Sequence, residues 1–320
     1  MLSQRFLRWP WQVAVATGVL LTAGSSLWRI LGMPTPSGSR AGELTPAIAP
    51  LPQDLEIQVF FNHSEASVYT DPYRQIERYG DDLEAVIITA IEQAETSIDL
   101  AVQALNLPRV ASALAKRHRE GLKVRVILEN QYANPTSAAA RTEQREDWLA
   151  IADSNRDGIL SDAELSQANA LGILSDAQVP LIDDTADGSK GSGLMHHKFL
   201  IIDSQRVITG SANFTLSGIH GDGDNPSSRG NANALLKIEN RAIAEQFTQE
   251  FNLMWGDGPA GRKNSQFGRS KPEPTAQTFN LKDTELTLQF SPQSTSRPWH
   301  QSTNGLIGQT LSQSERSIDL

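Results

Sequence analysis

The feature that most constrains this 320-residue chain is residues 195–215, MHHKFLIIDSQRVITGSANFT. An apolar run, a short polar turn and a second arm at 206–209 predict a β-hairpin. Because side chains alternate along a strand, His196 and Lys198 should share one face, while His197 joins the apolar residues on the other. The hairpin therefore predicts one face for chemistry and one for the core, and it assigns His197 to packing.

The residue types on the first face suit phosphate chemistry. An imidazole next to an ammonium favours attack on a phosphorus that carries anionic oxygens, since the lysine binds the charge and the histidine acts as nucleophile. The second arm should deliver the hydroxyl of Ser211 and the amide of Asn213 to the same end of the sheet. The sequence thus indicates a phosphoryl-transfer site.

The spacing of these residues is similar to a known motif. His196-x-Lys198-x4-Asp203-x6-Gly210-Ser211-x-Asn213 resembles the HKD signature of the phospholipase D superfamily, whose members cleave phosphodiesters through a covalent phosphohistidine without needing a metal. The resemblance implies an α/β fold, a phospholipase D-type α-β-α sandwich in which helices flank a mixed sheet. It also implies roles for five residues: His196 as nucleophile, Lys198 and Asn213 binding phosphate oxygens, Ser211 in support, and Asp203 as a structural part of the motif.

The pattern along the chain also favours an α/β fold. It predicts these elements in order: strand 55–62, helix 81–95, strand 97–105, helix 108–120, strand 122–129, the hairpin, strand 233–239 and helix 241–255. Alternating strands and helices are typical of a parallel sheet covered by helices, and the hairpin strand is expected at its centre.

The segment after the hairpin departs from the family. Related nuclease-like enzymes often place a glutamate there to orient the nucleophilic histidine, but residues 230–233 read GNAN. Asn233 can hydrogen-bond an imidazole, yet it cannot stabilise an imidazolium as a carboxylate does. Asp222 or Asp224 could substitute, although both are better explained as solvated loop residues.

An insertion at 137–176 contains DSNRDGILSDAE, residues 153–164, which matches an EF-hand calcium loop. The candidate metal ligands are Asp153, Asn155, Asp157, the Ile159 carbonyl, Ser161 and a bidentate Glu164. Helices are expected on both sides, at 142–152 and 162–170. A lone loop in an exported protein should bind calcium with a Kd on the order of 10⁻⁴ to 10⁻³ M. We therefore expect a structural calcium, while the resemblance to the phospholipase D superfamily implies a chemistry that needs no cofactor.

Charge and cysteine content narrow the function classes. The formal net charge of -9 gives no general attraction for polyanions, so a nuclease would need a local basic groove. The sequence has no cysteine, which excludes disulfides, thiolate metal sites and catalytic thiols.

The N-terminus predicts export. Residues 1–32 carry Arg5 and Arg8 before an apolar run, as in a signal peptide or a membrane anchor. The Pro-, Ser-, Gly- and Ala-rich residues 33–54 are typical of a flexible linker. We expect a periplasmic, extracellular or membrane-anchored protein, and cleavage of the signal is left open.

The C-terminal region repeats part of the first domain. After a linker predicted at 258–284, residues 286–292 are similar to 55–61, and residues 306–320 are similar to 86–100. The domain at 55–257 contains one complete HKD half, whereas the second repeat, 285–320, is truncated before any HKD strand.

The resemblance implies two histidines in the reaction. One attacks phosphorus, and the other protonates the leaving oxygen and then activates water. Either two copies of the chain form a homodimer and pair their His196 residues, or a second half is missing. The stop inside a would-be strand favours truncation.

We therefore expect a phosphodiesterase. The export signal and acidic composition favour a phospholipid substrate, with membrane association through the N-terminus. An exported endonuclease acting on nucleic acid is the alternative, favoured by the short HKD pattern and by Arg262, Lys263, Arg269 and Lys271. A third hypothesis is an inactive, calcium-dependent surface-binding fragment.

Overall fold

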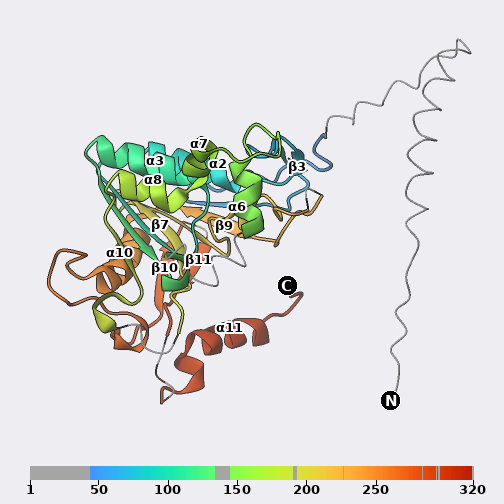
Figure 1. Cartoon of the computed structure of the whole chain (residues 1–320). Helices are drawn as coiled ribbons and strands as arrows, with labels where there is room; N and C mark the ends of the chain where they lie inside the picture. The colour runs from blue at the N-terminus through green and yellow to red at the C-terminus, as the bar shows by residue number, and fades with distance from the viewer. Residues whose placement is uncertain are drawn as a thin grey trace, which may run out of the picture. The chain divides into compact units, whose positions relative to one another are not determined.

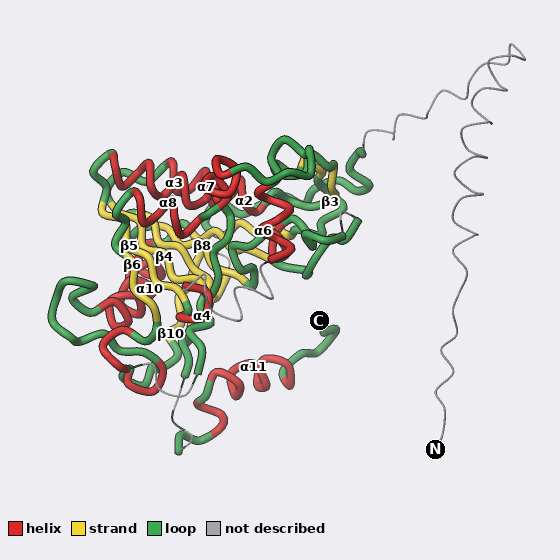
Figure 2. Tube along the Cα trace, in the orientation of Figure 1, coloured by secondary structure: helices red, strands yellow, loops and turns green. Residues whose placement is uncertain are grey.

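The computed structural model describes residues 44–133, 145–189, 193–225, 227–282, 284–292, 294 and 296–318. All of these belong to one unit of the chain, residues 44–320 (Figures 1 and 2). The predicted export signal lies outside the described residues, as do residues 33–43 of the predicted linker and residues 137–144 of the insertion. In the part that is described, no helix combines the length and apolarity needed to cross a membrane.

The centre of the fold is a seven-stranded mixed sheet with the strand order β1-β9-β8-β7-β4-β5-β6. Its strands are β1 (Ile57–Phe61), β4 (Ser97–Val102), β5 (Lys123–Leu128), β6 (Leu181–Asp183), β7 (Lys198–Ile202), β8 (Arg206–Gly210) and β9 (Ala234–Ile238). The hairpin strand β7 is the fourth of the seven, so its predicted central position is confirmed.

The strand directions only partly follow the predicted parallel pattern. The pairs β4–β5 and β5–β6 are parallel, as expected from the helical connections between them. At the edge of the sheet β1 pairs antiparallel with β9, with Val59 opposite Leu236. Four successive antiparallel pairs join β1 to β4 through β9, β8 and β7, so β1 runs in the same direction as β4 and β5, as predicted.

Helices cover both faces of this sheet. The main ones are α2 (Leu83–Glu92), α3 (Pro108–Arg119), α8 (Ala170–Asp176) and α10 (Arg241–Trp255). Leu200 and Ile202 of β7 belong to the core that packs on α2, α3 and α8, whereas Phe199 and Ile201 belong to the core that packs on α10. Figure 1 shows the first three helices on one side of the sheet and α10 on the other. The fold is therefore the predicted α/β class, a mixed sheet flanked by helices.

The remaining elements are short or peripheral. They are β2 (Val68–Thr70), β3 (Glu77–Tyr79), α4 (Asn130–Ala133), α6 (Arg145–Ala152), α7 (Asp162–Ala168), α9 (Leu216–Ile219), β10 (Gln277–Leu281), β11 (Thr284–Leu288) and α11 (Thr303–Ser312). Helices α6 and α7 agree with the two predicted around residues 153–164.

The segment predicted as a linker at 258–284 is more ordered than its composition suggested. It contains β10, which pairs with β11 in a separate two-stranded sheet. Phe267 and Leu281 are buried in the core beneath α10, because apolar side chains between the Gly, Pro and Ser residues anchor the segment there. Residues 286–292 and 55–61 are similar in sequence, but they do not occupy equivalent positions in the fold, because β11 and β1 lie in different sheets.

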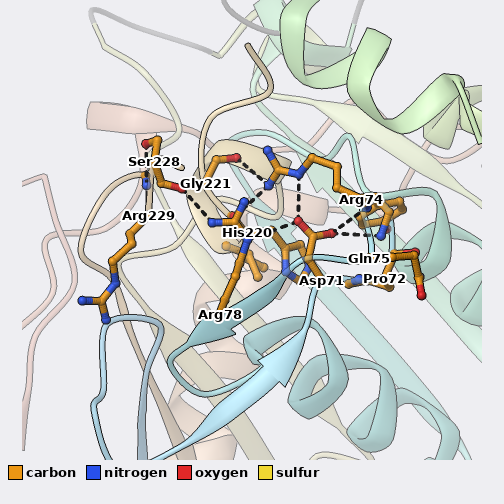
Figure 3. Close-up of polar contacts among 12 residues, drawn as sticks. Asp71, Pro72, Arg74, Gln75, Arg78, His220, Gly221, Ser228 and Arg229 are labelled. Atoms are coloured by element: carbon orange, nitrogen blue, oxygen red, sulfur yellow. Dashed lines mark hydrogen bonds and ion pairs between the residues drawn. The ribbon is translucent and has the colours of Figure 1, made fainter. Parts of the chain in front are cut away.

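The β2–β3 hairpin holds the loop between α9 and β9 in place. The fully buried carboxylate of Asp71 accepts hydrogen bonds from Nε of Arg74 at 2.8 Å and from Nε of Arg78 at 3.3 Å. Arg74 in turn donates to the carbonyl of His220, and Arg78 to the carbonyl of Ser228, both at 2.7 Å (Figure 3). A buried charge network therefore fixes the chain that leads into β9.

Candidate active site

The exposed ring of His196 and the buried side chain of Lys198 lie where β7 begins. Lys198 is only 8% exposed, and its Nζ donates to Oε1 of Gln103 at 3.2 Å and to the carbonyl of His196 at 3.1 Å. Burial lowers the pKa of Lys198 to about 8. At neutral pH the ammonium is still mostly charged, and with two acceptors among the described residues it keeps a third N–H for a substrate oxygen.

The environment of His196 keeps its imidazole neutral. Partial burial, then the charge of Lys198 and the neighbouring His197, lower the pKa of His196 below its ordinary value. The neutral ring has the nitrogen lone pair that nucleophilic attack requires. No described side chain hydrogen-bonds this ring, so it is open to a ligand.

The turn after β8 brings two more predicted residues to this end of the sheet. Nδ2 of Asn213 donates to Oε1 of Gln103 at 3.3 Å, the same oxygen that accepts from Lys198. Oδ1 of Asn213 is buried and has no hydrogen-bond partner among the residues that the structure describes. Ser211 donates to Oδ1 of Asn233 at 2.8 Å. Because an unsatisfied buried acceptor costs about 1–3 kcal/mol, Asn213 marks a place where a ligand can compensate.

Gln103 was missed by the sequence reasoning, although it connects the site. It is buried directly after β4 and bridges Lys198 and Asn213 through one oxygen. The sequence did contain a signal for Gln103: it is a polar residue at the carboxyl end of a buried strand, and open α/β sheets bind their ligands at that end. Only the pairing of Val102 with Lys198 shows that this end meets β7.

Asp203 lies at the opposite end of β7, at the turn of the hairpin. Its carboxylate accepts hydrogen bonds from the backbone N–H groups of Glu95, Thr96 and Ser97 at 2.7–3.1 Å and from the Thr96 hydroxyl at 2.8 Å. Burial raises the pKa of Asp203, but these hydrogen bonds outweigh it and the pKa is lowered. Five residues of strand separate it from the site by roughly 16 Å. The structure does not bring Asp203 together with His196, and it gives this motif residue a structural contact.

His197 packs on the other face of the strand, as predicted. Its ring meets those of Phe199 and Phe290 edge-on, and its Nε2 lies 2.9 Å from Oε1 of Glu250. The same carboxylate binds the ammonium of Lys271. Lys271 is thereby buried and paired, which weakens the basic cluster on which a nuclease interpretation relied.

The candidates for orienting His196 make other contacts. Asn233 accepts from Ser211 and donates to the carbonyl of Gly218 at 2.8 Å. The carboxylate of Asp222 accepts from the hydroxyl of Ser228. Neither is hydrogen-bonded to His196 in the described structure, so both residues order loops around the site.

Two cavities border this group of residues. One of about 290 Å³ is lined by His196 together with Leu194, Met195, Met254, Phe267 and Pro292, and it also carries Arg269 and Lys271. The other, of about 280 Å³, is lined by Ser211, Asn213 and further polar residues. The cavity at His196 also includes Asp184, His197 and Ser291, so it combines apolar, basic and acidic side chains, whereas the cavity at Asn213 is lined mostly by polar side chains.

Side chains of the predicted calcium loop, residues 153–164, form hydrogen bonds with other residues of the same loop. The Asp153 carboxylate accepts from the N–H groups of Asp157 and Gly158, each at 3.1 Å. Hydrogen bonds from Ser161 lower the pKa of Glu164 to about 2. The oxygen donors fit calcium by their chemistry. Among the described residues, however, no three histidine or acidic side chains are arranged to hold a metal, so calcium binding stays a prediction.

Residues 87–255 match the protein family described as cardiolipin synthase, PLD-like domain. Two curated relatives are a mitochondrial cardiolipin hydrolase from Xenopus tropicalis, 26% identical over 169 residues, and a phospholipase D from Rickettsia prowazekii, 28% identical over 166 residues. These alignments cover 53% and 52% of this chain, and 59% and 58% of the relatives. The chain therefore matches less than two thirds of either relative.

Similar solved structures include Nuc, a phospholipase D family member from Salmonella typhimurium, with a TM-score of 0.39 and 18% identity. That comparison covers 64% of this chain and 97% of Nuc. NucT from Helicobacter pylori has a TM-score of 0.33 and 16% identity, and the comparison covers 62% of this chain and 94% of NucT.

Proposed function

This chain belongs to the phospholipase D-like family, and from that premise we propose that it hydrolyses phosphodiesters through a phosphohistidine at His196. The observation that carries the proposal is the arrangement of Lys198 and Asn213 around one oxygen of Gln103, beside an imidazole held neutral. Two donors at one point suit the non-bridging oxygens of a phosphate.

The reaction has two displacement steps. A ring nitrogen of His196 attacks phosphorus, so a P–N bond forms, the P–O bond to the leaving group breaks, and the leaving oxygen takes a proton. Water then attacks phosphorus, the P–N bond breaks, and a phosphomonoester and neutral His196 are released. Lys198 and Asn213 bind the phosphate oxygens on which charge develops in each step.

We propose that a second copy of the chain supplies the proton donor as its own His196. His197 is unsuited to that role because it packs against Phe199 and pairs with Glu250 on the other face. A dimeric mass in solution, with specific activity that falls on dilution, is the expected result. Full activity from a monomer would overturn the dimer while leaving the His196 chemistry intact.

A phospholipid is the substrate that the site favours. The cavity beside His196 includes the apolar side chains of Leu194, Met195, Met254, Phe267 and Pro292, which an acyl-bearing substrate can contact. Arg269 adds positive charge for its anionic head group. Nucleic acid is less favoured, because Lys271 is paired with Glu250 and the chain carries a net charge of -9.

The test compares the wild-type protein with His196→Ala on a chromogenic phosphodiester, on phospholipid vesicles and on single-stranded DNA. His300→Ala is the matched control, since His300 is exposed and lies far along the chain from the motif. Loss of turnover in His196→Ala alone supports the enzyme. Equal background in all three proteins would instead favour a binding module, and faster cleavage of DNA than of lipid would favour a nuclease.

We also propose that residues 153–164 bind a structural calcium ion. Calcium at ten times its Kd should stabilise the fold by about 1.4 kcal/mol, seen as a calcium-dependent rise in Tm. Glu164→Gln should abolish this rise, and Asp176→Asn, an exposed carboxylate on α8, should keep it. An unchanged calcium response in Glu164→Gln would refute the site.

Export is the last part of the proposal, and it rests on the basic and apolar residues of the N-terminus. When residues 1–32 are fused to a reporter enzyme that is active only outside the cytoplasm, the fusion should show reporter activity. A silent, stably expressed fusion would contradict export.

A further inference from the structure

Part of the His196 cavity is built by residues that lie outside the family match. The match ends at residue 255, whereas the cavity is lined partly by residues 265–292, which we call the wall segment. The wall segment contributes Phe267, Gly268, Arg269, Lys271, Ser291 and Pro292, and the other lining residues come from 184–197 and from α10. The surroundings of the proposed nucleophile therefore include a segment that the matched residues do not contain.

Two buried side chains anchor the wall segment to the rest of the fold. Phe267 is 2% exposed in the core beneath α10, and its N–H donates to Oγ of Ser189 at 3.1 Å. Lys271 is 8% exposed, and its Nζ donates to Oε1 of Glu250 and, at 2.9 Å, to the carbonyl of Ser291. Lys271 thus fastens the two stretches of the wall segment that line the cavity to each other and to α10.

The carboxylate that pairs with Lys271 also contacts the strand of the nucleophile. Oε1 of Glu250 lies 2.9 Å from Nε2 of His197, the residue next to His196. Burial raises the pKa of Glu250, but the hydrogen bond from His197 and the charge of Lys271 outweigh it, so the pKa is lowered and the carboxylate is charged at neutral pH. The ion pair of Lys271 and Glu250 therefore connects the wall segment to the start of β7.

Arg269 lies between the two anchors, in a 3₁₀ turn at Gly268–Ser270. Its side chain is exposed and lines the cavity. Among the described residues Arg269 forms no ion pair, whereas the charge of Lys271 is neutralised by Glu250. Of the two basic side chains that the wall segment brings to the cavity, Arg269 is the one whose charge is available to an anion.

We propose that the wall segment is a substrate-binding part of the active site, in which Arg269 binds the anionic phosphodiester and Lys271 is a positioning residue that holds Arg269 at the cavity through its ion pair with Glu250. The inference rests on the proposed phosphodiesterase function and assigns further residues to that site. An interaction made equally with substrate and transition state changes KM and leaves kcat unchanged.

The experiment measures kcat and KM on bis(p-nitrophenyl) phosphate, a singly charged phosphodiester, and the Kd of inorganic phosphate by calorimetry. Arg269→Gln should raise KM and Kd about fivefold with kcat unchanged, the upper end for a solvent-exposed ion pair. Lys271→Met should have the same effect, although its ammonium is buried and paired, because Arg269 loses its fixed position.

A double variant separates positioning from a simple loss of charge. If Lys271 acts through Arg269, Arg269→Gln/Lys271→Met should stay near a fivefold rise, whereas independent effects would multiply to about 25-fold. Lys282→Met is the matched control, since it removes one positive charge from an exposed position of the wall segment that does not line the cavity. It should keep the wild-type KM and Kd.

A second pair of changes guards against loss of the fold. Lys271→Met leaves the buried carboxylate of Glu250 without its ammonium partner, which is destabilising. Glu250→Gln/Lys271→Met removes both charges and keeps a side-chain oxygen for His197, so it should fold and show the same rise in KM and Kd. Circular dichroism and Tm establish folding for each variant. A folded Glu250→Gln/Lys271→Met protein with wild-type KM and Kd would overturn the positioning role.

The remaining outcomes separate the wall segment from the proposed chemistry. Unchanged KM and Kd in Arg269→Gln, or an equal rise in Lys282→Met, would overturn the binding role, while His196-dependent turnover would leave the phosphodiesterase standing. A rise of about 25-fold in the double variant would overturn the action of Lys271 through Arg269. Absence of turnover, with phosphate affinity still lost in Arg269→Gln and Lys271→Met, would overturn the proposed function and support the wall segment.

Discussion

The two ends of the β7–β8 hairpin carry residues of the same sequence motif but differ in how their polar groups are paired. At the turn, Asp203 accepts from three backbone N–H groups and a hydroxyl. At the other end, within the described part of the chain, Asn213 has a buried oxygen without a hydrogen-bond partner, and Lys198 has two acceptors. The hydrogen bonding of Asp203 thus fits a structural role, and the incomplete hydrogen bonding of Lys198 and Asn213 is the basis on which we propose that they bind phosphate.

The largest effect that tests this contrast is expected from Lys198→Met. Removing the ammonium should lower kcat/KM on a chromogenic phosphodiester by about 100- to 1,000-fold, as for the loss of one preorganised donor to a developing oxyanion. Stability should stay within about 1 kcal/mol, because burying an ammonium is itself costly. Lys123→Met, at an exposed strand position, is the control. A large loss of stability with little loss of turnover would reverse the roles of the two ends.

Asp203→Ala should show the opposite behaviour. Loss of the hydrogen bonds to residues 95–97 should lower the free energy of unfolding, measured by urea denaturation, by about 2 kcal/mol. This value already allows for solvent screening of the partly exposed carboxylate. Because its pKa is lowered in the folded protein, this contribution is present above about pH 4 and disappears as pH falls through the lowered pKa. The folded fraction should keep wild-type kcat/KM. Inactivity of a fully folded variant would place Asp203 in the chemistry after all.

Gln103→Leu should have a moderate effect on activity. The change removes the oxygen shared by Lys198 and Asn213, so both donors lose their fixed direction, and kcat/KM should fall about tenfold. Gln167→Leu, at an exposed position in α7, should have no such effect. Unchanged kinetics in Gln103→Leu would show that the bridge does not order the site.

The smallest effect is a pH dependence. With the pKa of Lys198 at about 8, the charged fraction roughly halves between pH 7 and pH 8, and kcat/KM should fall in proportion. Gln103→Glu should move this alkaline limb to higher pH, since a neighbouring carboxylate stabilises the ammonium. The lowered pKa of His196 predicts an acidic limb below about pH 6.5. An alkaline limb that stays in place in Gln103→Glu would separate it from Lys198.

The sequence was informative where a periodic pattern repeats. The helix predicted at 241–255 and the alternation of Phe199 and Leu200 between two cores both agree with the structure. It was less informative where a contact joins distant segments. The edge position of β1 depends on its pairing with β9, and the order of residues 258–284 depends on a few apolar side chains that pack in the core under α10.

By itself the sequence determined the family, the central strand and the residues that we propose bind phosphate, because local spacing on a strand decides which side chains share a face. Only the tertiary structure decided that Gln103 joins Lys198 to Asn213, that Lys271 is neutralised by Glu250, and that Asp147 of the insertion lines a cavity beside the site. The physical reason is that hydrogen bonding and burial depend on neighbours separated by many residues, and no local pattern records them.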